Sequence, residues 1–262
     1  MSKQPAIFVM VDMEGISGIT HGAQVTPTDP AYASGRRYMA WDTNACIEGL
    51  FRGGAGRVVV RDSHMDGANM FWEDIDSRAE LIQGRGSIER MEKIEQFDAL
   101  ILLGYHGMHG TPGAILEHTI TSRFWQKFWI NGQEGGEVAI ESSIAGEHGV
   151  PVVMVSGDDK LCAEAKALLP WVTTVQVKTG LSREGGQLLG KDIAHRLIRE
   201  GAEHAVRRIA ECSVYRVAAP VTLQVELVSR GTVPAHQPHV KVIDGRTYEV
   251  TAGSVEEAFR VL

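Results

Sequence analysis

Four short apolar runs, each closed by glycine or by polar residues, constrain the fold of this chain more than any other feature. Each run is continuously apolar rather than apolar at alternate positions, which is typical of strands covered on both faces of a sheet. The runs span residues 6–12, 57–62, 98–104 and 151–156.

Stretches with helical periodicity separate these runs. Residues 38–52 and 186–212 place apolar side chains at a spacing of about 3.6 residues. Strands that alternate with helices predict an α/β fold, in which a mostly parallel sheet is flanked by helices and joined by right-handed crossovers.

Two segments break the alternation and predict additions to the sheet. Residues 115–120 and 126–130 predict the two strands of an inserted β flap at about 111–133. The last residues predict a strand, a hairpin with Asp244-Gly245 at its turn and a closing helix from Ser254. We therefore expect an α/β domain over residues 1–215 and a small α+β subdomain over 216–262.

The composition excludes several classes of function. The formal net charge of −7 has the wrong sign for a protein that binds nucleic acid through its phosphates. The apolar runs are much shorter than the roughly 20 residues that cross a bilayer, and the first residues do not show a signal-peptide pattern. We expect a cytoplasmic protein with neither a nucleic-acid nor a membrane partner.

The three cysteines, Cys46, Cys162 and Cys212, contribute no recognisable motif. They are odd in number and far apart, and no Cys-x-x-Cys pair occurs. This usage does not predict disulfides or a thiolate zinc site. We interpret all three as reduced side chains of the core.

Acidic and histidine side chains follow three of the predicted strands at their carboxyl ends. Asp12 and Glu14 follow the first strand, His64 the second and His106 the third. Because residues two apart in an extended chain point to the same side, Asp12 and Glu14 present two carboxylates together. Taken alone, the two acidic residues are explained equally well by a turn and a helix cap, and a single histidine in a loop is most often a solvated or capping side chain. Because ligands of open α/β sheets bind at the carboxyl ends of the strands, their convergence predicts a single site.

Two more residues extend this candidate site. Glu137 opens a predicted helix, where the helix dipole alone favours a carboxylate. As a fifth ligand it completes a set of three carboxylates and two histidines, which suits zinc or manganese. Five ligands exceed what one catalytic zinc usually takes, so we expect two metals bridged by one carboxylate, an arrangement typical of hydrolases.

His118 lies on the predicted flap, either as a general acid or base or as an exposed strand histidine.

Six motifs in chain order resemble the zinc-dependent D-aminopeptidases. The resemblance runs from Val9 to about Lys178. The motifs are Asp12-Met13-Glu14-Gly15-Ile16-Ser17-Gly18, Asp62-Ser63-His64, Gly104-Tyr105-His106, Thr111-Pro112-Gly113 with His118-Thr119, Gly136-Glu137, and Val155-Ser156-Gly157-Asp158-Asp159.

The resemblance implies an activity, a cofactor and an assembly. It implies removal of an N-terminal D-amino acid from short peptides, with His118 as an additional catalytic residue. It also implies a homo-oligomer, a ring-like decamer that encloses the active sites. Finally, it implies two Zn²⁺ ions per subunit, held by Asp12, Glu14, His64, His106 and Glu137.

Two other functions remain open from the sequence. The same metal site could hydrolyse another amide or a phosphate ester, although phosphatases usually add arginine or lysine clamps, which the predicted strand ends lack. A non-catalytic ring protein that uses the metal only for stability is the third possibility. Turnover of D-alanyl peptides by the metal-loaded protein separates these readings.

Overall fold

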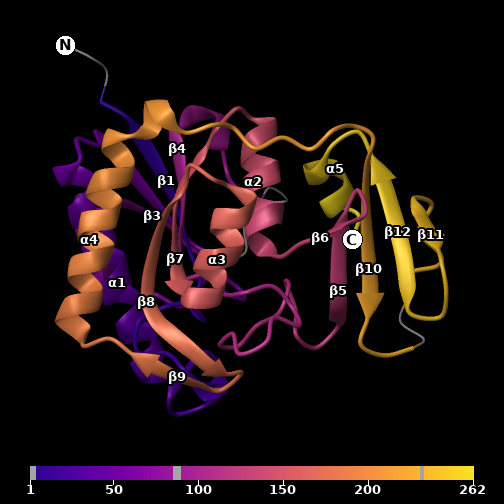
Figure 1. The fold of residues 1–262 in the computed structure, drawn as a ribbon, viewed down its shortest axis with the longest axis horizontal. Helices are drawn as coiled ribbons and strands as arrows, with labels where there is room; N and C mark the ends of the chain where they lie inside the picture. The colour runs from indigo at the N-terminus through magenta and orange to yellow at the C-terminus, as the bar shows by residue number, and fades with distance from the viewer. Residues whose placement is uncertain (1–3, 85–89, 231–232) are drawn as a thin grey trace.

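Sheet A forms the centre of the molecule and carries the strands predicted from the four apolar runs (Figure 1). The computed structural model describes residues 4–84, 90–230 and 233–262. The strand order of sheet A is β3-β2-β1-β4-β7-β8-β9, parallel throughout except that β9 runs antiparallel to β8. Its strands are β1 (Ala6–Val11), β2 (Arg57–Asp62), β3 (Glu80–Ile82), β4 (Ala99–Leu103), β7 (Val152–Asp158), β8 (Thr173–Ser182) and β9 (Gly185–Leu188).

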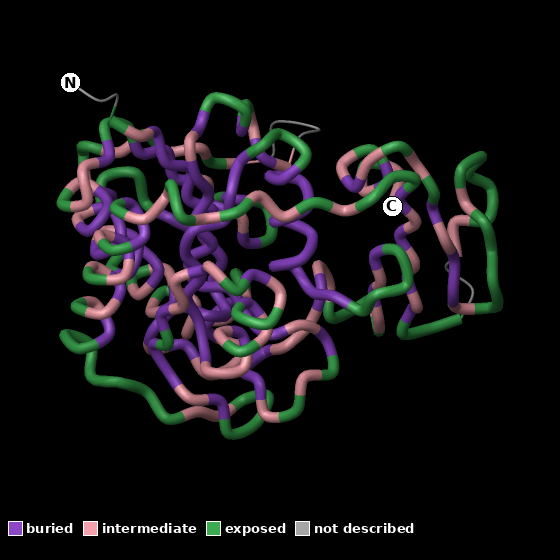
Figure 2. The backbone as a smooth tube through the Cα atoms, turned by 45° about the horizontal axis from the view of Figure 1, so that its top comes forward, coloured by how far each residue is buried: buried purple, intermediate pink, exposed green. Residues whose placement is uncertain are grey.

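Helices cover both faces of sheet A, which confirms the predicted fold class. Alternate residues of β1 point to opposite faces: Ile7 and Val9 pack toward α1 and α4, whereas Phe8 and Met10 pack toward α2 and α3. Figure 2 shows a buried interior, and the exposed residues of α1 and α4 face away from the sheet, whereas α2 is buried from Glu137 to Gly146. The helices are α1 (Tyr32–Arg52), α2 (Glu137–Glu147), α3 (Asp159–Leu168) and α4 (Lys191–Arg207), with short 3-10 turns η1 (Gly22–Gln24), η2 (Trp72–Asp74), η3 (Ile94–Gln96) and η4 (Ile209–Glu211).

Sheet B lies beside sheet A and is antiparallel (Figure 1). A helix, α5 (Val255–Phe259), packs on it, and the Ser254 side chain caps this helix by accepting a hydrogen bond from the Glu257 amide, 3.1 Å away. The predicted closing helix therefore begins where expected. The strand order is β11-β12-β10-β5-β6, and the strands are β5 (Trp125–Ile130), β6 (Gln133–Glu134), β10 (Val221–Leu227), β11 (Val240–Val242) and β12 (Thr247–Ala252).

The inserted segment differs in detail from the predicted hairpin. Residues 115–120 form no strand, because the backbone enters the left-handed region at Leu116, with φ of 53°, and at Ile120, with φ of 62°. The second predicted strand exists as β5, but it pairs with β6 and β10. Sheet B thus draws strands from both sides of residue 216, and the predicted domain division there remains a prediction.

The predicted long helix over residues 186–212 is also shorter than expected. Its first residues form β9, which pairs with β8, and α4 starts only at Lys191. None of the helices in the described residues is long and apolar enough to cross a membrane.

The candidate site lies where the strand order of sheet A reverses. β1 sits between β2 and β4, so the chain moves outward through β2 and β3 and then returns to the other side of β1. In open α/β sheets, ligands bind at the carboxyl ends of the strands beside such a reversal.

Candidate metal centre

The loop after β1 is held tightly against the loop after β4. The Gly15 amide donates to the Gly104 carbonyl at 2.8 Å. A Cβ atom at Gly15 would lie 1.7 Å from the Tyr105 carbonyl oxygen, so only glycine fits there. This contact fixes the two carboxylates of the β1 loop relative to the histidine that follows Tyr105.

Lys178, a residue of β8 that the sequence did not single out, secures the same loop from inside the protein. Its side chain is buried, and the ammonium group donates to the carbonyls of Glu14, Ile16 and Ile19 at 2.6, 2.8 and 2.7 Å. Burial lowers the pKa of Lys178 to about 8. Lys178 therefore positions the backbone that carries Glu14.

Replacing Lys178 by methionine is expected to lower the free energy of unfolding by about 3 kcal/mol, because buried carbonyls lose their donors. Urea denaturation measures this change. Lys241→Met is the matched control, since Lys241 pairs with Glu249 on the surface and is 73% exposed. That change should cost less than about 1 kcal/mol. Equal losses in both variants would contradict the role of Lys178.

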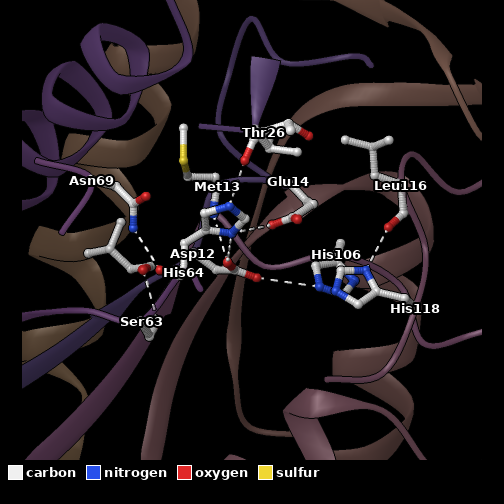
Figure 3. Close-up of polar contacts among 12 residues, drawn as sticks. Asp12, Met13, Glu14, Thr26, Ser63, His64, Asn69, His106, Leu116 and His118 are labelled. Carbon is white, nitrogen blue, oxygen red and sulfur yellow. Dashed lines mark hydrogen bonds and ion pairs between the residues drawn. The ribbon is translucent and has the colours of Figure 1, made fainter. Parts of the chain in front are cut away.

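A first group of potential ligands consists of Asp12, Glu14 and His64 (Figure 3). His64 Nδ1 lies 3.1 Å from Asp12 Oδ1 and 3.2 Å from Glu14 Oε2. Its other ring nitrogen, Nε2, is 2.9 Å from the Val25 carbonyl, which can only accept a hydrogen bond. Nε2–H therefore donates to this carbonyl, and Nδ1 is the ring nitrogen that faces the carboxylates and could bind a metal once it has lost its proton.

A second group consists of His106, His118 and Glu137. His106 Nδ1 lies 3.1 Å from the Gly107 carbonyl, and its Nε2 lies 3.3 Å from Glu137 Oε1. His118 Nδ1 lies 2.9 Å from the Leu116 carbonyl, and its Nε2 lies 3.8 Å from Glu137 Oε1. The two imidazole rings stack with centroids 4.0 Å apart (Figure 3). Backbone carbonyls thus hold both rings with Nε2 toward Glu137.

Asp12 connects the two groups. Its Oδ1 faces His64, and its Oδ2 lies 3.4 Å from His106 Nε2. The structure therefore brings together all six residues singled out from the sequence in one cluster, of which five are buried and His118 is partly exposed. Their individual roles remain predictions, and the position of His118 within a potential ligand group is a geometry that the sequence did not suggest.

The charges in the cluster perturb one another strongly. Burial alone would raise the pKa of Asp12, but the imidazoles of His106 and His64 beside its carboxylate hold that pKa well below its usual value. Burial alone would lower the pKa of His64 and His106, but the carboxylates beside them raise both well above the usual range. The charge of His106 lowers the pKa of Glu137 to about 2 despite its burial. Asp12 and Glu137 therefore stay ionised at neutral pH, so the cluster favours cations.

The donor set fits zinc. Carboxylate oxygens and imidazole nitrogens are ordinary zinc ligands, and each group of three has its ligand atoms within 4.8 Å of one another. Two buried atoms that face the cluster, Glu14 Oε2 and His106 Nε2, make no hydrogen bond within the described residues. Buried polar atoms rarely lack a partner. Binding of a metal by these two atoms would explain why they have no hydrogen-bond partner within the described residues.

Side chains outside the six predicted site residues support the cluster. Asp62 accepts hydrogen bonds from the Asn69 and Met70 amides at 2.6 and 3.0 Å, while Asn69 donates to the His64 carbonyl at 2.7 Å. Arg90 pairs with the buried Glu141 and lies 3.9 Å from Glu137. These contacts orient the loops that carry the candidate ligands.

A pocket of about 360 Å³ opens over the cluster. Asp12, Glu14, His64, His118 and Glu137 line its acidic part. Three arginines from separate parts of the chain, Arg90, Arg123 and Arg183, line the same pocket. A cavity of this size admits a small ligand, in direct contact with the potential metal ligands.

Comparison with known proteins places this chain in a family. A family model described as D-aminopeptidase matches residues 6–262. The chain belongs to the D-aminopeptidase family. A D-aminopeptidase from Bacillus subtilis (strain 168) is 35% identical over 205 residues, which cover 77% of this chain and 73% of that protein.

A solved member of this family has the same fold. It is the Zn-dependent D-aminopeptidase DppA from Bacillus subtilis, described as a self-compartmentalizing protease. The TM-score is 0.93 at 30% identity, over 97% of this chain and 94% of the DppA chain. The D-aminopeptidase fold therefore includes both sheets, and the suspected family is confirmed.

Proposed function

We propose that this protein is a zinc-dependent aminopeptidase that removes the N-terminal residue of short D-amino-acid-containing peptides, with two zinc ions per subunit. The observation that carries the proposal is the position of Asp12, whose two oxygens face two separate groups of ligand atoms. A single carboxylate between two such groups is the arrangement that bridges a metal pair. Family membership and the zinc dependence of DppA support the choice of metal and substrate.

The side chains divide between the two metal positions. Glu14 and His64 would hold one ion, His106 and Glu137 the other, and Asp12 both. Zinc at these positions supplies Lewis-acid polarisation of a peptide carbonyl and a water whose pKa is lowered toward neutrality.

His118 is the side chain placed to move a proton. Its Nδ1–H is committed to the Leu116 carbonyl, so Nε2 is available to accept or donate a proton on the pocket side. The stacked His106 ring keeps the imidazole from turning. We assign His118 the role of a general acid, which transfers a proton to the leaving amine when the peptide bond breaks.

An assembly proposal accompanies this function. Because the related DppA is a self-compartmentalizing protease, we propose that this chain also forms a homo-oligomer that encloses its active sites. The decameric ring and the cytoplasmic location remain predictions from the sequence. Sedimentation of the purified protein determines the number of subunits.

A phosphate ester is the second candidate substrate, because of one structural observation. The predicted strand ends carry no arginine clamp, but Arg90, Arg123 and Arg183 reach the same pocket from loops. Arginines that converge near a metal can stabilise a transferring phosphoryl group. p-Nitrophenyl phosphate therefore belongs in the substrate panel.

Metal removal and reconstitution test the proposed function. Treatment with a chelator is expected to lower the turnover of D-alanyl-D-alanine at least about a hundred-fold, because the peptide carbonyl is no longer polarised. Addition of zinc should restore the turnover. The matched substrate is L-alanyl-L-alanine, which the enzyme should cleave much more slowly. Preference for the L-peptide would defeat the substrate assignment, and turnover of p-nitrophenyl phosphate alone would favour the second candidate.

A further inference from the structure

The three arginines of the metal-site pocket differ in the hydrogen bonds and ion pairs that their guanidinium groups make. Arg90 is committed to Glu141, to which its Nε donates at 2.6 Å. Arg183 Nε lies 3.8 Å from Glu117 Oε1, and its side chain is 51% exposed. The Arg123 guanidinium has no hydrogen bond or ion pair with any part of the chain that the structure describes. Positive charge is therefore available at this pocket.

The segment that carries Arg123 is tied to the metal centre. The Ile120 amide donates to Glu137 Oε1 at 2.8 Å. A turn follows, in which the Trp125 amide donates to the Thr121 carbonyl at 3.1 Å and the Arg123 amide lies 3.4 Å from Thr121 Oγ1. Arg123 thus projects from a hydrogen-bonded turn, three residues beyond the contact with a candidate ligand.

Arg183 is joined to the same segment by a backbone hydrogen bond. Its carbonyl accepts a hydrogen bond from the Leu116 amide at 2.8 Å, two residues before His118. The backbones of both arginines are therefore held in fixed relation to the loop that carries His118. Within the described residues, the pocket therefore joins a cluster of potential metal ligands to the uncommitted guanidinium of Arg123 and to that of Arg183, which is paired only at 3.8 Å with Glu117.

Cationic side chains beside a metal site repel the metal, so their presence calls for an anionic part of the ligand. A short peptide whose first amide lies at the metal centre carries one invariant anion, its C-terminal carboxylate. An extended residue spans about 3.3–3.6 Å, so this carboxylate lies roughly 7–10 Å from the N-terminus of a dipeptide or tripeptide. Guanidinium groups bind carboxylates through charge-assisted, often bidentate, hydrogen bonds.

We propose that Arg123, assisted by Arg183, binds the C-terminal carboxylate of the substrate and so restricts this site to short peptides with a free C-terminus. The inference rests on the proposed peptidase function. Arg123 is a specificity determinant in this assignment and takes no part in bond cleavage. A longer peptide has its carboxylate outside the pocket and loses this interaction.

A comparison of two substrates in two enzymes tests the assignment. The zinc-loaded full-length protein and its Arg123→Gln variant are assayed with D-alanyl-D-alanine and with its C-terminal amide. We expect kcat/KM of the wild-type protein to be about ten-fold higher for D-alanyl-D-alanine than for its amide, because the amide cannot form the charged hydrogen bond. The difference should lie in KM. Arg123→Gln should lower kcat/KM for the acid by the same factor and leave the amide unaffected, whereas Arg183→Gln should have a smaller effect of the same kind.

Arg196→Gln is the matched control. Arg196 lies on the exposed face of α4, where it pairs with Glu200, and its replacement should change neither substrate's kinetics. An equal loss for acid and amide in Arg123→Gln, or no loss for either, overturns the inference while the peptidase function stands. If the unchanged zinc-loaded protein cleaves neither peptide, the proposed function fails, and the inference fails with it.

Discussion

Replacing Asp12 by asparagine is expected to abolish zinc retention and turnover together. The change removes the charge whose two oxygens face His64 and His106, so both groups of ligands lose their shared member. Loss of an outer-shell partner typically costs 10–100-fold in metal affinity, and a direct shared ligand should cost more than about 100-fold. Zinc content by atomic emission and turnover of D-alanyl-D-alanine are measured on the same sample.

Asp158→Asn is the matched control for this prediction. Asp158 is also buried, but its carboxylate accepts hydrogen bonds from the Leu161 and Ile115 amides, outside both ligand groups. Its replacement should reduce stability and leave the zinc content unchanged. If Asp12→Asn retains two zinc ions per chain, Asp12 is not the bridging ligand, and the grouping proposed for the cluster is wrong.

The central part of this arrangement could be predicted because parallel strands obey simple geometric rules. Residues that follow the apolar runs of β1, β2 and β4 must meet at one edge of the sheet, which is where Asp12, His64 and His106 lie. The runs themselves were recognisable because helices cover both faces of these strands. The edge strand β9 contains two glycines and one leucine, so it has no hydrophobic pattern to reveal it.

The supporting residues could not be predicted because their roles depend on contacts between distant segments. Lys178 is a charged residue within a strand, and nothing near it in the sequence indicates that its ammonium group is buried against carbonyls of the β1 loop. Arg123 reaches the pocket from the loop that follows the left-handed residues Leu116 and Ile120, and Arg183 reaches it from the turn between β8 and β9. Periodicity carries no information about such paths.

His118→Gln is expected to separate metal binding from catalysis. The imidazole lies next to Glu137 and stacks on His106, but the five other residues of the cluster already provide donors for two ions. Zinc content should therefore stay unchanged, whereas kcat should fall by about 100- to 10,000-fold, the contribution typical of a positioned general acid or base. Rapid-quench measurement of a single turnover shows whether the loss lies in the chemical step.

The geometry of His118 also defines the result that would contradict this role. Its Nε2 belongs to the same potential ligand group as His106 and Glu137, so loss of one zinc per chain in His118→Gln would make it a ligand rather than a proton donor. His148→Gln is the control, because His148 pairs with Glu256 away from the pocket and should affect neither zinc nor kcat. Full zinc content with near-normal kcat would leave proton transfer to another group, since the leaving amine still requires a proton.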